Sequence, residues 1–277
     1  GLGEQPGDTV GYRVRLDTRV GRATRIEVVT EGILTRMLEE DPALERYGAV
    51  IFDEFHERSL HADLGLALAL ESQQVLRPEL RILVMSATLD TAGVAALLDG
   101  CPVVSSAGRT HPVEVRHAER RPEGRIEGAG AATVRAALVE SEGDVLVFRP
   151  GVGEIKRVEA ALAGVVPAIV PLHGTLAPAD QDRALRPDPR GRRKVILATS
   201  VAETSLTIDG VRVVVDGGLS RVPRFSPRTG MTRLETVRVS RASAAQRAGR
   251  AGRQAPGVCY RLWSAADEAG LVPYHAP

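Results

Sequence analysis

The chain has 277 residues, of which 43% are hydrophobic and 26% are charged, and its formal net charge is +1. This composition excludes a disordered chain, and at about 100–200 residues per domain the length predicts two domains. No apolar run reaches the ~18 residues of a membrane span, and no signal peptide is evident. We therefore expect no membrane partner. Cys101 and Cys259 lack CxxC spacing and indicate neither a disulfide framework nor a zinc site, so we expect a reducing, cytoplasmic location.

Short strand-like runs alternate with helical patterns along the first part of the chain, which is typical of a parallel α/β sheet. Residues 49–52 and 81–85 are apolar runs, and we expect both to be strands buried on both faces. Residues 60–76 predict a helix with Leu64, Ala67 and Leu68 on one face. A further helix is expected from Thr91.

The same alternation continues in the second part of the chain. We expect strands over 113–115, 145–148, 168–170, 195–197 and 211–215, with helices near 153–163 and 178–185. Turn residues at 108–112 predict a domain join, and 119–130 an exposed loop. We therefore predict domains at 1–108 and 109–277, with ligands bound at the carboxyl ends of the strands.

Two adjacent acids, Asp53 and Glu54, directly follow the first predicted strand. At a strand end, Asp53 can hold Mg²⁺ through its water shell and Glu54 can orient or deprotonate an attacking water. A pair of solvated loop acids is the other interpretation. A zinc hydrolase is a weaker hypothesis, because His56 and His61 are five residues apart, whereas the zinc helix needs a spacing of four.

Small hydroxyl side chains follow the second predicted strand, at Ser86 and Thr88. Their hydroxyls can hydrogen-bond across a cleft beside the acidic pair, and these bonds can respond to whether a ligand is bound there. Capping of the helix near Thr91 is the alternative.

The segment 246–253 holds three arginines, two glycines and a glutamine. In a helix, Arg250 and Arg253 would project from one face, with Gln246 one turn earlier. Planar guanidinium groups suit phosphate oxygens and can stabilise charge in phosphoryl transfer. Gly249 and Gly252 disfavour a helix, so close approach to another group is the better reason for them. A solvated basic helix is the alternative.

These blocks resemble the DEAH/RHA family of helicases. Residues 53–56, 86–88, 198–210 and 246–253 look like its motifs II, III, V and VI in the family's order, with Phe55 in place of the usual Ala. The resemblance covers nearly the whole chain. It implies two RecA-like parallel-sheet domains in tandem, ATP and Mg²⁺ bound between them, and single-stranded RNA bound across both.

The resemblance also implies roles for particular residues. Asp53 would bind Mg²⁺, Glu54 would activate water, and Gln246, Arg250 and Arg253 would contact the γ-phosphate side. Ser205 and Asp209 would serve the nucleotide, and Thr30, Thr175 and Thr199 would touch the RNA backbone. His56, Ser86 and Thr88 would couple the nucleotide state to domain movement.

The prediction of nucleic-acid binding has independent support, because residues 219–253 hold nine arginines and a single acid. This stretch predicts a local positive potential and sequence-independent binding to the phosphate backbone. A P-loop is missing, because neither Lys156 nor Lys194 follows the required glycine. The first domain is therefore expected to be N-terminally truncated, and Arg149, where the family commonly has Leu, to be surface variation.

The leading hypothesis is an ATP-dependent RNA helicase or translocase. The 277 residues are expected to be inactive alone, because the phosphate loop and its lysine are missing. An RNA-binding pseudo-helicase that never hydrolyses ATP is the alternative.

Overall fold

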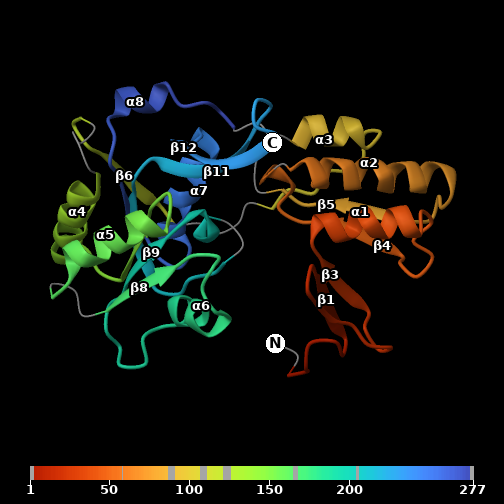
Figure 1. Cartoon of the computed structure of the whole chain (residues 1–277), viewed down its shortest axis with the longest axis horizontal. Helices are drawn as coiled ribbons and strands as arrows, with labels where there is room; N and C mark the ends of the chain where they lie inside the picture. The colour runs from red at the N-terminus through yellow and green to blue at the C-terminus, as the bar shows by residue number, and fades with distance from the viewer. Residues whose placement is uncertain are drawn as a thin grey trace. The chain divides into compact units, whose positions relative to one another are not determined.

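The computed structural model describes residues 3–57, 59–86, 91–106, 111–120, 126–164, 168–203 and 206–274. The chain divides into two units, Gly1–Ser105 and Ser106–His275, and each is described by itself (Figure 1). Of the predicted join at 108–112, Gly108 to Thr110 lie outside the described residues, and the division into 1–108 and 109–277 stays a prediction.

Unit 2 is built on six parallel strands, which confirms the α/β prediction for this part of the chain. In spatial order they are β6 (Val113–His117), β13 (Gly257–Arg261), β10 (Val211–Asp216), β7 (Asp144–Phe148), β9 (Val195–Ala198) and β8 (Ile169–Leu172). Every residue of β7 and β9 is buried. Strands buried on both faces read as continuous apolar runs, which is why the sequence predicts them well.

Helices cover both faces of this sheet. On one face α4 (Ile126–Glu140) and α5 (Val152–Leu162) bury Val134 and Val158 against β7, β9 and β10. On the other, α6 (Pro178–Leu185) and α7 (Arg241–Gly249) bury Ala184 and Ala248. The two separate apolar clusters make unit 2 a three-layer α/β structure.

Several elements of unit 2 were not predicted. β11 (Leu219–Ser226) and β12 (Met231–Arg238), which follow β10 and precede α7 along the chain, pair as an antiparallel hairpin. η2 (Ser200–Ala202) and η3 (Arg250–Gly252) are short 3₁₀ helices, and α8 (Ala265–Ala269) follows β13.

The predicted loop over 119–130 is wrong for its last five residues, because α4 begins at Ile126. Gly128 and Gly130 disfavour a helix by propensity, which misled the prediction. Gly130 has a packing reason, since a Cβ there would lie 1.6 Å from Nη2 of Arg149. Among the described residues, no helix combines the length and apolar character that crossing a bilayer requires.

The described part of unit 1 contains two small sheets and three α-helices. β2 (Asp17–Arg19), β1 (Val10–Val14) and β3 (Ile26–Val29) form one sheet, and the parallel strands β4 (Ala49–Phe52) and β5 (Arg81–Val84) the other. The helices are α1 (Glu31–Glu40), α2 (Leu60–Val75) and α3 (Thr91–Leu97), and η1 (Phe55–Glu57) is a 3₁₀ turn. β4, β5, α2 and α3 confirm the predicted elements.

The expected burial of these elements is partly wrong. Val50 and Phe52 face the core, but Ile51 and Leu83 are 58% and 51% exposed, because helices pack on only one face of β4 and β5 in the described part of unit 1. On α2 the buried face is formed by Ala62, Gly65, Leu66, Ala69 and Ser72. The predicted face differs, and Leu64 is exposed.

Candidate nucleotide and nucleic-acid site

The acidic pair lies where β4 ends. Asp53 follows Phe52 directly, and the Glu54 amide donates to Oδ1 of Asp53 at 2.9 Å. Glu54 has a φ of +49°, a left-handed conformation that is uncommon for a residue with a side chain. Such outliers persist where surrounding structure imposes them, and they cluster at functional sites.

The surrounding structure is supplied by Phe55. Its side chain is buried and meets Phe52 edge to face, with ring centroids 6.1 Å apart. Its amide donates to the Met85 carbonyl at 3.0 Å, while the Met85 amide donates to the Phe52 carbonyl at 2.8 Å. Phe55 therefore anchors the turn after the acidic pair to the end of β5.

Four other residues of unit 1 were predicted to belong to the site: Thr30, His56, Ser86 and Thr88. Ser86 follows Met85 and is exposed, while Thr88 lies outside the described residues, so the coupling role of both stays a prediction. The His56 side chain is buried, with Nδ1 3.5 Å from Oε2 of Glu54. Thr30 is the N-cap residue of α1, and its exposed hydroxyl makes no capping hydrogen bond.

In unit 2 the predicted RNA contacts lie at the carboxyl edge of the sheet. Thr199 follows β9 directly, and its amide donates to the carbonyl of Leu172, the last residue of β8, at 3.1 Å. Thr175 is three residues beyond β8, and its Oγ1 lies 2.9 Å from Nδ1 of the buried His173. The two threonines therefore follow neighbouring strands.

The predicted nucleotide residues of unit 2 lie at the opposite edge. Asp209 comes just before β10, where the Asp144 amide at the start of β7 donates to the Gly210 carbonyl at 2.8 Å. Arg253 precedes β13, is exposed, and donates from Nη1 to Oγ1 of Thr207 at 3.3 Å. These two residues therefore lie away from the carboxyl ends at which we expected ligands to bind, and their assignment to the nucleotide stays a prediction. Ser205 lies outside the described residues.

The arginine block runs from one edge of the sheet to the other. α7 ends at Gly249 and continues as η3. A Cβ on Gly252 would lie 2.5 Å from the His111 carbonyl oxygen, just before β6, whereas Gly249 has open space around it. Close approach thus explains Gly252 alone, and the approach is to the chain itself.

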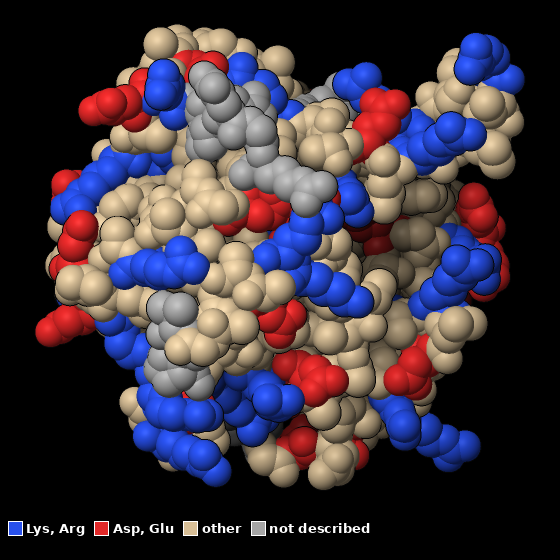
Figure 2. Space-filling view, turned by 60° about the vertical axis from the view of Figure 1, so that its left-hand side comes forward, with Lys and Arg blue, Asp and Glu red and all other residues tan. Residues whose placement is uncertain are grey.

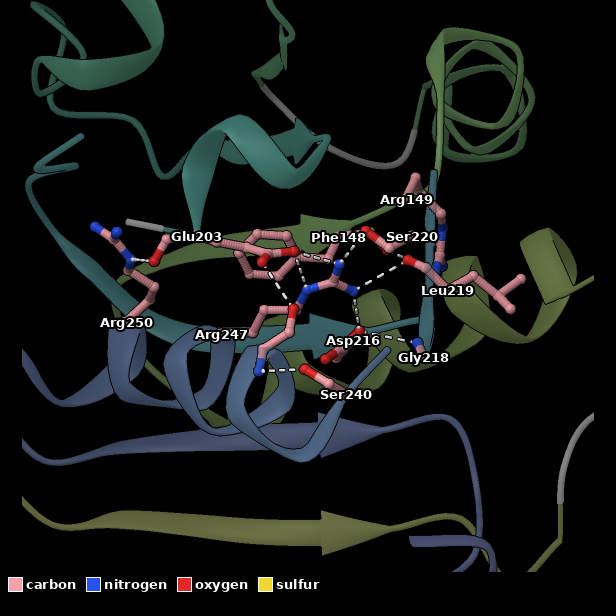
Figure 3. Close-up of polar contacts among 11 residues, drawn as sticks. Phe148, Arg149, Glu203, Asp216, Gly218, Leu219, Ser220, Ser240, Arg247 and Arg250 are labelled. Carbon is pink, nitrogen blue, oxygen red and sulfur yellow. Dashed lines mark hydrogen bonds and ion pairs between the residues drawn. The ribbon is translucent and has the colours of Figure 1, made fainter. Parts of the chain in front are cut away.

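Arg247, which the sequence analysis did not single out, is the centre of a buried polar network (Figure 3). Nε donates to Oε1 of Glu203 at 2.7 Å, and Nη1 donates to Oδ1 of Asp216 at 2.8 Å and to the Leu219 carbonyl at 3.2 Å. The guanidinium carbon lies 4.8 Å from the centroid of the Phe148 ring. Burial opposes the charged form, but the two carboxylates outweigh it and raise the pKa of Arg247.

This network joins motif V, the end of β10, the base of the β11–β12 hairpin and α7. Ser243 on α7 adds a second contact by donating to Oε2 of Glu203 at 2.7 Å. The signal that could have found Arg247 is its place between Ala244 and Ala248, whose spacing gives α7 a buried face.

The two arginines predicted to contact the γ-phosphate, Arg250 and Arg253, are in different environments. Arg250 is buried and donates from Nε to the Glu203 carbonyl at 2.7 Å and from Nη1 to the Leu206 carbonyl. It therefore holds the backbone of motif V, whereas Arg253 is exposed. Gln246 is half-buried on α7.

Arg149 is not surface variation, and that prediction is wrong. Its side chain is 1% exposed and lies against Gly130 and Gly217, whose missing side chains leave room for it. Nε and Nη2 have no hydrogen-bond partner in the described part of the chain, and Nη1 donates to the Phe148 carbonyl at 3.1 Å. Burial lowers the pKa of Arg149 to about 10.

Burial and ion pairing reduce the positive charge that the arginine-rich stretch 219–253 presents to solvent. Arg247 and Arg250 are buried, and Arg247 is paired with Glu203 and Asp216. The exposed members that form ion pairs are Arg221 with Glu154, Arg224 with Glu235, and Arg238 with Asp267. The face in Figure 2 carries basic and acidic side chains interspersed. Arg228 and Arg233, both exposed, make no ion pair with another described residue.

Neither lysine lies in a phosphate loop. Lys156 is on α5, and the buried Lys194 donates from Nζ to the Ala184 carbonyl at 2.9 Å, near the end of α6. Burial lowers the pKa of Lys194. Within the described ranges, no group of three or more His, Cys, Asp or Glu side chains is arranged to hold a metal ion.

Comparisons with known proteins show which proteins this chain resembles. The helicase conserved C-terminal domain model matches residues 131–255. The ATP-dependent RNA helicase HrpB of Escherichia coli (strain K12) is 54% identical over 264 residues, which are 94% of this chain and 33% of HrpB. The probable ATP-dependent RNA helicase DHX34 of Homo sapiens is 37% identical over 289 residues, which are 99% of this chain and 25% of DHX34.

A solved structure shows the same likeness. The crystal structure of the Escherichia coli DEAH/RHA helicase HrpB matches with a TM-score of 0.93 at 51% identity, covering 100% of this chain and 36% of that one. The chain spans about a quarter to a third of the length of these relatives. Identity at this level over nearly the whole chain shows that it belongs to the DEAH/RHA family of helicases.

Proposed function

We propose that the protein containing this chain is an ATP-dependent RNA helicase or translocase. The observation that carries the proposal is the place of Asp53 and Glu54 at the end of β4, beside the end of β5, with Glu54 held in a left-handed conformation. The relatives are named ATP-dependent RNA helicases, which supplies the reaction class.

In this proposal Glu54 orients or deprotonates the attacking water, and Asp53 holds Mg²⁺. Both are hard oxygen donors at a strand end, which suits Mg²⁺, and the ion would neutralise charge on the phosphates. From the second unit, Asp209, Ser205, Gln246, Arg250 and Arg253 serve the nucleotide. Arg253 is the exposed arginine and the more direct candidate for a phosphate contact, while Arg250 acts by holding motif V.

Single-stranded RNA is the proposed partner, bound by its backbone through Thr30, Thr175 and Thr199. The last two follow neighbouring strands at the carboxyl edge, and Arg228 and Arg233 add positive charge on the hairpin side. His56, Ser86 and Thr88 would couple the nucleotide state to movement. A cytoplasmic location is part of the proposal, and the free thiols of Cys101 and Cys259 suit a reducing compartment.

The test is Glu54→Gln in the full-length parent protein. We expect RNA-stimulated ATP turnover to fall by about 10²–10⁴-fold, the usual contribution of a general base, while ATP binding is retained. Glu39→Gln, at an exposed position on α1, is the matched control. Unchanged turnover in Glu54→Gln would contradict the assignment, and a wild-type parent that binds RNA without hydrolysing ATP would favour a pseudo-helicase.

A further inference from the structure

Gln254 makes a two-point contact with the end of motif V. Its Nε2 donates to Oδ1 of Asp209 at 2.8 Å, and its Oε1 accepts from the Gly210 amide at 2.9 Å. Both ends of the amide are thus used on two consecutive residues more than forty positions away in the chain. Such a pair of bonds fixes the orientation of its partners as well as their distance.

The backbone on which Asp209 lies is already fixed. Ile208 is buried in the core, the Asp209 amide donates to the Leu185 carbonyl at 3.2 Å, and Gly210 has a φ of +84°, which glycine adopts without strain. What remains to be set is the direction of the Asp209 carboxylate. The described residues bond only one of its oxygens, Oδ1, and the donor is Gln254.

We propose that Gln254 is a positioning residue for the nucleotide, acting through Asp209. Its amide donates to Oδ1 of Asp209, so that Oδ2 is left for the ligand, and its Oε1 accepts from the Gly210 amide. Arg253, the preceding residue, forms a second link by donating to Thr207. The stretch that carries the exposed Arg253 therefore also orients the Asp209 carboxylate, through the next residue along the chain.

This inference rests on the proposed function, in which Asp209 serves the nucleotide. A neutral amide is suited to the task because it donates to a carboxylate without cancelling its charge. Glutamate at position 254 has the same shape but would face Asp209 with a like charge and no donor.

The experiment uses the full-length parent with Gln254→Ala, Gln254→Glu, Asp209→Ala and the double variant Gln254→Ala/Asp209→Ala. A hydrogen bond to a charged group supports a change of about 3- to 10-fold, discounted for exposure. We expect the KM for ATP to rise by that factor in Gln254→Ala and further in Gln254→Glu, with kcat nearly unchanged. In the Asp209→Ala background, Gln254→Ala should have no further effect. Gln74→Ala, at an exposed position on α2, is the matched control.

Affinity for a fluorescent ADP analogue, measured on the same variants, separates the two proposals. A parent that binds the analogue but does not hydrolyse ATP overturns the proposed function, and the binding cycle then decides the role of Gln254. Additive effects of the two substitutions, or an unchanged KM and affinity in Gln254→Ala, would overturn the positioning role. A parent that neither binds nor hydrolyses nucleotide would overturn both.

Discussion

Arg247 and Asp216 form an ion pair with 2.8 Å between Nη1 and Oδ1, and their side chains are 1% and 0% exposed. A pair so completely removed from water is stable only while both charges are present, because the desolvation of each is offset by the other. Glu203 completes the balance on the second side of the guanidinium. Arg247 therefore provides the buried charged link between α7 and the end of β10.

Arg247→Met should destabilise unit 2 strongly, because it leaves Asp216 buried without its counter-charge. Breaking a buried pair in this way costs about 3–5 kcal/mol. Hydrogen exchange of the β10 amides in the full-length parent would measure the loss. Arg183→Met is the control, since its pair with Asp180 is exposed and should contribute about 0–1 kcal/mol. Equal protection in the two variants would contradict the prediction.

Gly130→Ala should destabilise the chain only while Arg149 is present. The new Cβ would lie 1.6 Å from Nη2 of Arg149, and overpacking of this kind costs about 1–3 kcal/mol. In the Arg149→Leu background the contact is gone, and the better helix propensity of Ala should make the same change favourable by about 1 kcal/mol. A double-mutant cycle by thermal unfolding measures the coupling.

Gly128→Ala is the control for this cycle, because nothing lies within 4 Å of a Cβ at that position of α4. It should be neutral or stabilising in either background. Additivity between positions 130 and 149 would show that the buried guanidinium does not occupy the space between Gly130 and Gly217.

The sequence predicts well the elements that are set by residues adjacent in the chain. β7 and β9 are continuous apolar runs, and α6 begins with Pro178 at the predicted residue. The β11–β12 hairpin escaped prediction because most of its side chains are exposed on both faces, so no apolar alternation marks it. The place for Arg149 is formed by glycines on α4 and after β10, which no local pattern brings together.

The candidate site divides in the same way. Asp53, Glu54 and Thr199 follow strands that the sequence predicts, β4 and β9, whereas Arg253 precedes β13, which the sequence analysis did not predict. The sequence could not show that Asp209 and Thr199 lie at opposite edges of one sheet. That separation depends on the path of the chain between β9 and β10, and the contact of Gln254 with Asp209 depends on it too.

Phe55→Ala would restore the family's usual residue and should nevertheless destabilise unit 1. The ring is buried against Phe52 and fills the core beside the acidic turn, and Phe→Ala changes in cores cost about 3–5 kcal/mol. Thermal unfolding of the full-length parent checks this. Phe225→Ala, on the exposed hairpin, should change stability by no more than about 0.5 kcal/mol. A stability gain in Phe55→Ala would refute the packing argument.

Cys259 should resist alkylation while the protein is folded. Burial raises the pKa of its thiol to about 12, against an ordinary value of 9.0, and the thiolate is the reactive form. At pH 8.5 mass spectrometry should find Cys101, which is partly exposed, modified well before Cys259. The unfolded chain should release this proton near its ordinary pKa, so the thiol's contribution to stability is present below about pH 9 and is lost towards pH 12. Early modification of Cys259 would indicate opening of the β10–β13 region.

Thr199→Val should weaken RNA binding without unfolding the protein. Valine keeps the shape of threonine but removes the hydroxyl, and Thr199 makes no side-chain capping bond to η2 that the change would break. Loss of one neutral hydrogen bond supports a drop in affinity of about 2- to 10-fold. The drop should be similar for RNAs of different sequence, because backbone contacts carry no sequence information.

Thr30→Val tests the corresponding position in unit 1, where the N-cap hydroxyl is likewise not engaged with its helix. Fluorescence anisotropy with short single-stranded RNAs of two unrelated sequences would measure both variants, at one fixed salt concentration because phosphate contacts are salt-dependent. Thr18→Val, at an exposed position on β2, should leave affinity unchanged. If Thr18→Val weakened binding as much as Thr30→Val and Thr199→Val, the effect would reflect general surface change, and the assignment of these threonines to the RNA backbone would fail.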